Sequence, residues 1–202
     1  MTEQLPTVRI IEALHREYAP NEQVFELVWT HCRIVRDVAL QLVETSGIKI
    51  DSNLVQVGCL LHDIGVYSLF DENGFENVKD YITHGVRGEE ILKNEGFSEV
   101  ISRFASHHTG AGITREEIVA RNLPLPHQDF IAETPEEELV MYADKFHSKT
   151  EPPYFNSHKY YTNYVTRFGE ESSASFAALT AKFGKPDLAP FLEMYGHALR
   201  DE

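Results

Sequence analysis

Residues 59–65 read Cys59-Leu-Leu-His-Asp-Ile-Gly65, so that an imidazole and a carboxylate stand side by side in an apolar run. Burying such a pair is costly unless something pairs with both side chains. A bound metal ion would satisfy both at once. The stretch therefore predicts a metal site whose remaining ligands come from elsewhere in the chain.

Two residues far from this stretch lie on apolar faces where such ligands are needed. His31 falls on the apolar stripe of a predicted helix, and Asp144 lies one turn after Val140 in another. Taken alone, His31 is more typical of a core histidine whose hydrogen bonds are satisfied, and Asp144 of a solvated carboxylate. Together with His62 and Asp63, they supply the imidazoles and carboxylates of a mixed site. Such ligands suit Fe, Mn, Zn, Ni or Co and do not choose among them.

Three more histidines lie between the two aspartates in sequence. His84 opens one predicted helix, and His107-His108 close another. Each could be a surface residue, but their order suggests extra ligands for a second metal. Asp63 is then the candidate bridge, with a bridging hydroxide as the nucleophile, because two metals about 3.5–4 Å apart can share both.

The remaining pattern predicts an all-α chain, because helical periodicity and caps recur and no alternating run predicts a strand. A polar stretch from Asp71 to Asp80 separates the early helices from the later ones. Two segments have capping-box spacing, Thr114–Glu117 and Thr134–Glu137, and the second helix continues through Asp144 toward Ser148. The other predicted helices run from Thr7 to Tyr18, from Asn21 through Leu42, from Asp51 to a stop at Gly65, from Thr83 to Asn94, and from Ser98 to His108.

After Pro152-Pro153 the sequence becomes rich in aromatic residues. Aromatic stripes usually mark buried faces, so we expect two or three amphipathic helices that cover the core. Alternatively, part of this aromatic surface forms a dimer interface or the wall of a substrate pocket. The sequence thus leaves open whether the chain forms a homodimer.

Composition narrows the class of protein. The chain has 202 residues, no apolar run long enough to span a membrane, and no signal-peptide pattern in its first residues. Its two cysteines, Cys32 and Cys59, lie in apolar helical patterns, so we expect a cytoplasmic protein with reduced thiols. The net charge of −14 disfavours partners such as nucleic acid polymers and anionic membranes, although it permits a small phosphorylated substrate at a metal.

The ordered set of His31, His62-Asp63 and Asp144 resembles the HD-domain superfamily of metal-dependent phosphohydrolases. The run Leu60–Gly65 is similar to the HDIG motif of that family, and the resemblance covers roughly Val24 to Lys149. It implies an all-helical bundle, which we place at residues 1–150. The tail after Pro152 does not match the family, and we expect residues 151–202 to form a helical extension packed on the same domain.

The resemblance also implies roles for individual residues. His31, His62, Asp63 and Asp144 match the ligands of the first metal. The second metal would be held by His84 and by one or both of His107 and His108, with His108 favoured because it shares an apolar face with Phe104. The branch with these histidines builds a two-metal site, for which iron is favoured.

One position departs from the family pattern. Many members follow the motif with a lysine that meets the substrate phosphate, but Val66 stands there in this chain. This weakens a cyclic-dinucleotide specificity. Arg87 and Lys145 are the candidate catalytic cations in its place, each as readily interpreted as a solvated surface residue.

The sequence thus favours a hydrolase of a small phosphate ester or nucleotide that uses one or two divalent metals. A di-iron oxygenase on the same ligand set and a noncatalytic nucleotide sensor are the alternatives. The substrate pocket would depend on the loops 67–80 and 110–134 and on the tail, which carry no recognisable motif.

Overall fold

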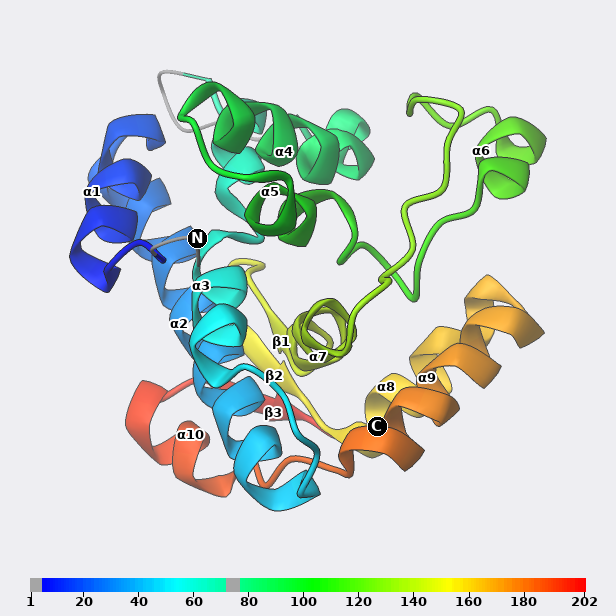
Figure 1. Ribbon diagram of the computed structural model, residues 1–202. Coiled ribbons are helices and arrows are strands. Elements are labelled where there is room, and N and C mark those ends of the chain that lie inside the picture. Colours follow the sequence, from blue (N-terminus) through cyan, green and yellow to red (C-terminus); the bar gives the residue numbers. More distant parts are fainter. Residues whose placement is uncertain (1–4, 72–76) are drawn as a thin grey trace.

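Helices dominate the computed structural model, which describes residues 5–71 and 77–202 (Figure 1). The predicted all-α class is confirmed. The first helices are α1 (Val8–Tyr18), α2 (Glu22–Ser46), α3 (Ser52–Leu61), α4 (His84–Asn94), α5 (Glu99–Ser106), α6 (Arg115–Arg121) and α7 (Pro135–Asp144). The later ones are α8 (His158–Val165), α9 (Glu170–Phe183) and α10 (Ala189–Tyr195). Three short 3-10 helices complete them: η1 (Ile64–Leu69), η2 (Val78–Thr83) and η3 (Thr166–Phe168).

Several helices begin at capping residues where the sequence predicts a start, although Ser98 at the start of α5 makes no side-chain capping bond. The side chains of Thr7, Asn21 and Asp51 accept hydrogen bonds from backbone N–H groups in the first turns of α1, α2 and α3. Thr114 and Thr134 form complete capping boxes at α6 and α7. Part of the predicted polar stretch, residues 72–76, lies outside the described residues.

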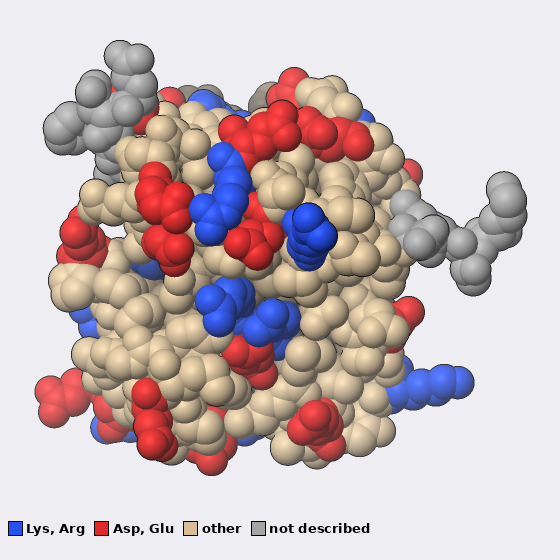
Figure 2. Space-filling view, turned by 90° about the vertical axis from the view of Figure 1, so that its left-hand side faces the viewer, with Lys and Arg blue, Asp and Glu red and all other residues tan. Residues whose placement is uncertain are grey.

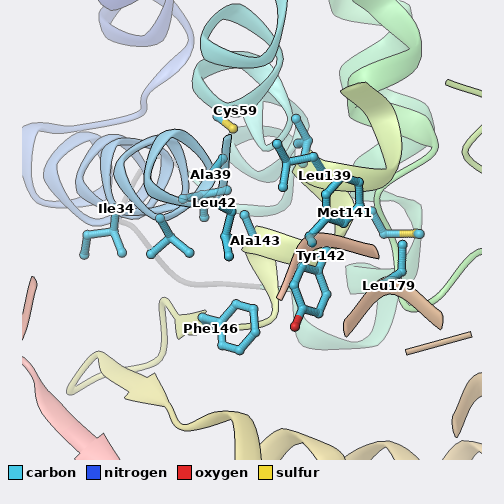
Figure 3. Close-up of a cluster of buried hydrophobic side chains, with 14 of the residues drawn as sticks. Ile34, Ala39, Leu42, Cys59, Leu139, Met141, Tyr142, Ala143, Phe146 and Leu179 are labelled. Atoms are coloured by element: carbon cyan, nitrogen blue, oxygen red, sulfur yellow. The ribbon is translucent and has the colours of Figure 1, made fainter. Parts of the chain in front are cut away.

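The core has two main apolar clusters that meet along α2. One joins α2, α3 and α7 to the C-terminal helices; Figure 3 shows Leu42, Cys59, Tyr142 and Leu179 gathered in it. The other joins α1, α2 and α3 to η1, α4 and α5. Because α2 and α3 contribute to both clusters, side chains on their inner faces lie where the two halves of the bundle meet.

A close backbone approach brings η1 against α4. A Cβ atom at Gly65 would overlap the carbonyl oxygen of His84 and the backbone nitrogen of Gly88. The predicted helix stop at Gly65 is therefore wrong: α3 ends at Leu61, and Gly65 lies inside η1. The glycine is needed here for packing, and this packing holds the residues after α3 next to the start of α4.

A small sheet is the feature that the sequence did not predict. Strand β1 (His147–Ser148) pairs antiparallel with β2 (Tyr154–Asn156), and β2 pairs parallel with β3 (Ala198–Arg200). The helix expected to run toward Ser148 ends at Asp144 instead. Strands of two or three residues are too short to produce an alternating pattern.

The C-terminal segment covers the core with its aromatic residues. Phe176 and Phe183 of α9 and Phe191 of α10 are buried in the cluster that contains α2 and α7. This is the expected helical extension, while the boundary at residue 150 stays a prediction. Across residues 5–71 and 77–202, none of the helices combines the length and the apolar character needed to cross a membrane.

Candidate metal centre

The ends of five structural elements converge on one buried point. His62 directly follows α3, and Asp63 precedes η1. His84 is the first residue of α4, His108 follows α5 by two residues, and Asp144 is the last residue of α7. Of these six residues, His31 alone lies in the interior of a helix, on the buried face of α2. Six of the seven metal ligands expected from the sequence therefore come together here.

The first group of donor atoms consists of His31, His62, Asp63 and Asp144. The Nε2 atom of His31 lies 3.1 Å from Oδ2 of Asp63 and 3.0 Å from Oδ1 of Asp144. The Nε2 atoms of His31 and His62 are 3.3 Å apart. Ligands about 2.1 Å from a common ion are separated by about 3.0 Å at right angles and about 3.4 Å in a tetrahedron. The spacing of these donor atoms fits such an ion.

The second group consists of Asp63, His84 and His108. The Nε2 atoms of His84 and His108 lie 3.0 Å apart, and each is 3.5 Å from Oδ1 of Asp63. Asp63 thus turns Oδ2 toward the first group and Oδ1 toward the second. This is the arrangement expected of a carboxylate that bridges two ions.

Backbone carbonyls fix the orientation of three of the four imidazoles. Nδ1 lies 2.7 Å from the Cys59 carbonyl oxygen in His62, 2.6 Å from that of Tyr81 in His84, and 3.2 Å from that of Phe104 in His108. A carbonyl can only accept, so Nδ1 carries the proton and Nε2 presents its lone pair to the centre. Such second contacts of ligating histidines are typical of metal sites.

Asp63 is the strongest sign that a cation belongs at this point. Its side chain is fully buried, and apart from the Lys149 ammonium beside Oδ2, neither carboxylate oxygen receives a hydrogen bond of good geometry. Buried polar atoms are rarely left in this state without an explanation such as an ion. The residues present therefore fit one or two divalent transition metals.

Electrostatics hold Asp63, His84 and His108 in the forms that ligands require. At His62, burial alone would lower the pKa, but the charge of Asp63 outweighs it and raises that pKa well above its usual value. Burial alone would raise the pKa of the Asp63 carboxyl, but Lys149 and His62 outweigh it and hold that pKa well below its usual range. Burial lowers the pKa of His84 to about 3 and also lowers that of His108. At neutral pH Asp63 is therefore charged, and these two imidazoles are neutral.

Two lysines adjoin the centre. Lys145, an expected site residue, donates to Oδ2 of Asp144 at 2.8 Å and to the carbonyl oxygen of His108 at 2.9 Å. Lys149, which no sequence motif marks, places Nζ 2.5 Å from Oδ2 of Asp63 and faces the Tyr81 ring. The available signal was its position, five residues after Asp144 in a chain that lacks the usual lysine at Val66.

Two expected site residues lie apart from the donor groups. Nδ1 of His107 lies 2.6 Å from the Ser106 hydroxyl, and its ring packs against Phe130. Since α5 ends at Ser106, consecutive side chains diverge, and only His108 turns inward. Arg87 donates to the carbonyl oxygen of Ser68.

Two further histidines extend the contacts of His31 away from the donor groups. Nδ1 of His31 lies 2.9 Å from Nδ1 of His147, and Nε2 of His147 lies 2.9 Å from Nδ1 of His197. Neither His147 nor His197 was predicted as a site residue. His147 follows Asp144 by three residues, whereas no signal in the sequence connects His197 to the site.

These features define a helical domain in which two adjoining groups of His and Asp side chains share one buried carboxylate. The model of the HD domain family matches residues 28–149, and the chain belongs to that family. The match ends at Lys149 and so includes both lysines that adjoin the centre.

Comparison with individual proteins gives relatives of mixed kinds. An uncharacterised protein of Methanocaldococcus jannaschii, MJ0778, is 39% identical over 122 residues, which are 59% of this chain and 65% of that protein. A tRNA (cytidine(56)-2'-O)-methyltransferase of Picrophilus torridus is 38% identical over 124 residues, 61% of this chain and 32% of the enzyme. The chain thus spans less than two thirds of each of these relatives.

A solved structure with a related arrangement is the HD domain of the L. monocytogenes phosphodiesterase PgpH in complex with cyclic-di-AMP. It is 17% identical, with a TM-score of 0.48, over 94% of this chain and 86% of that chain.

Proposed function

We propose that the chain is a metal-dependent phosphohydrolase that acts on a small phosphate ester or nucleotide. The observation that carries this proposal is the division of Asp63 between two donor groups, with one oxygen toward each. Membership of the HD domain family supports it. Iron, manganese, zinc, nickel and cobalt all suit the donor set, and iron is favoured for a pair.

The residues of the chain divide the work. His31, His62 and Asp144 would hold one metal, His84 and His108 the other, and Asp63 both. When bound, the metals supply Lewis-acid activation of a phosphoryl oxygen and of a water molecule. The packing around Asp63 excludes bulk water from the inner side of the site, so charges there act at low dielectric.

The substrate would enter beside Lys149 and Asp144. The histidine ligands and Asp63 have side chains exposed by 4% or less, whereas Asp144 is 17% and Lys149 12% exposed. On this side the Lys149 ammonium, beside Oδ2 of Asp63, is the cation that would meet the phosphate. Lys149 is therefore our preferred catalytic cation, and Lys145 and Arg87 remain candidates for the same role.

The surface is consistent with a small substrate. On the face drawn in Figure 2, the basic side chains are few and lie among acidic ones. A phosphate backbone is bound by a continuous basic surface, which this face lacks. With the net charge of −14, this supports a small molecule held at the metals over a polymer.

Metal analysis combined with a phosphate-release screen tests the proposal. Protein purified without added metal is expected to contain two transition-metal equivalents and to hydrolyse part of a panel of nucleotides and phosphate esters. His62→Ala and Asp63→Ala should lose both properties, while His127→Ala, at an exposed histidine, should keep them. Retention of metal and hydrolysis by both site variants would refute the proposal.

The same preparation distinguishes the other chemistries. Oxygen uptake by the iron-loaded protein, without phosphate release from any panel member, would replace the hydrolase with an oxygenase. Tight nucleotide binding without turnover across several metals would replace it with a sensor.

A further inference from the structure

His31 differs from the other imidazoles of the centre in what holds it. His62, His84 and His108 each use a backbone carbonyl close by in sequence, which any residue at that position would supply. Nδ1 of His31 instead meets Nδ1 of His147, a side chain 116 residues away. The orientation of His31 therefore depends on a residue that mutation can remove.

The hydrogen bonds between His31, His147 and His197 determine which ring nitrogen of each carries the proton. With Nε2 of His31 turned to the first group, its proton is on Nδ1, and Nδ1 of His147 must accept. A neutral imidazole has one donor and one acceptor, so Nε2 of His147 donates to Nδ1 of His197. The contacts of 2.9 Å are then two successive N–H···N hydrogen bonds, both directed outward from the centre.

The small sheet positions His147 and His197 beside each other. His147 is the first residue of β1 and pairs with Phe155 of β2, while His197 immediately precedes β3 on the other side of β2. The imidazoles of His147 and His197 are nearly coplanar, with centroids 5.1 Å apart and planes 25° from parallel, and both pack against the ring of Phe155, which is fully buried. The C-terminal strand thereby delivers His197, although it lies beyond the segment that matches the family.

We propose that His147 and His197 are positioning residues of the metal centre, with His147 orienting His31 and His197 orienting His147. The inference rests on the proposed function, because it requires that His31 is a metal ligand. It gives the C-terminal segment a role in the site: the last residues of the chain set the geometry of a ligand in α2.

The test exploits the different shapes of asparagine and glutamine. The Asn amide oxygen can occupy the place of Nδ1 of a histidine, whereas the Gln amide reaches the place of Nε2. His147→Asn therefore keeps an acceptor for His31, but His147→Gln and His147→Ala do not. At the next position, His197→Asn keeps the acceptor for His147, and His197→Ala does not.

The measurement is Co²⁺ binding to the full chain after its metal has been stripped with a chelator, followed by calorimetry and by the visible absorption of bound Co²⁺. His147→Gln and His147→Ala should bind Co²⁺ about 10- to 100-fold more weakly than wild type and alter the spectrum. His147→Asn should restore both. His197→Ala should weaken binding by less than His147→Ala. His158→Ala, at a half-buried histidine of α8 that bonds Thr180, should bind as wild type.

A His31→Ala variant separates the two hypotheses. If His31→Ala weakens Co²⁺ binding but His147→Ala does not, the positioning role is refuted and the metal centre stands. If His147→Asn binds as weakly as His147→Ala, the acceptor role is likewise refuted. If His31→Ala itself binds Co²⁺ as wild type, the centre on which the proposed function depends is refuted.

Discussion

At Asp63, one buried carboxylate faces two groups of imidazoles and one ammonium group. The ammonium of Lys149 lies at the same oxygen that faces His31. A cation in this place can either meet a substrate phosphate or only balance the charge of Asp63. Truncation of the three candidate cations distinguishes these roles.

We expect Lys149→Met to lower kcat about 100-fold with its metal content unchanged, because loss of a preorganised charge at the transition state costs this much. Lys145→Met should instead lose metal, since Nζ of Lys145 already bridges Asp144 and the His108 carbonyl. Arg87→Met should change kcat least, because the guanidinium of Arg87 donates to the carbonyl oxygen of Ser68. Steady-state kinetics with metal analysis on each variant decides the order, and a larger loss of kcat in Arg87→Met than in Lys149→Met would reverse the assignment.

Outside the centre, the burial of His15 predicts that the stability of the fold depends on pH. Its ring is fully buried between the Tyr67 hydroxyl and the Leu60 carbonyl, and this burial lowers its pKa from 6.5 to about 4. The unfolded chain binds a proton here below pH 6.5, whereas the folded chain does not until about pH 4. Stability should therefore fall as the pH drops from 6.5 toward 4, by an amount on the order of 3 kcal/mol from this residue.

Urea unfolding between pH 7.5 and 4.5, in the presence of a chelator, measures this effect. The difference in unfolding free energy between wild type and His15→Gln should shrink as the pH falls. His127→Ala serves as the control at an exposed histidine. A difference that stays constant across the range would contradict a neutral buried His15.

Among the elements, the contact between η1 and α4 decides whether the two donor groups meet. Gly65→Ala should destabilise the fold by about 1–3 kcal/mol, because the added methyl group overlaps the backbone of α4. It should also lower the affinity for the second metal, since His84 begins α4 and must stay close to Asp63.

Gly47→Ala is the matched control. Gly47 ends α2 with a φ of 68°, has open space around it, and lies away from the donor groups, so alanine there costs stability through backbone conformation alone. Denaturant unfolding and metal titration of both variants test the difference. A Gly65→Ala protein that keeps two metals with wild-type affinity would show that the close approach does not position His84.

How far the sequence predicts these elements depends on their length. The capping boxes at Thr114 and Thr134 and the buried face of α2 follow from local patterns, and the structure has them. The turn after Asp144 does not, because β1 forms by pairing with β2, which no local pattern records. His147 therefore falls in a segment that local patterns extend as a helix.

For the whole molecule, residue type and order along the chain indicate the inner donors, since a buried carboxylate or imidazole needs a partner. They do not reveal Lys149 or His197. Both are ordinary polar residues in sequence, and only tertiary packing brings them to Asp63 and His147. Shared chemistry made the inner donors predictable, whereas the groups that orient and neutralise them depend on the packed structure.

The centre joins α2, α4 and α7 to the turns after α3 and α5, so a metal that binds it should stabilise the whole fold. Ligand at 100 times its Kd adds about 2.7 kcal/mol per site. For a chain of this size, that corresponds to a rise in Tm of roughly 5–11 °C. We expect Mn²⁺ or Co²⁺ to produce such a shift in chelator-stripped protein, measured by differential scanning calorimetry. Asp144→Ala should remove most of it, because α7 supplies no other donor to the first group. An equal shift in wild type and Asp144→Ala would mean that the stabilising ion binds elsewhere.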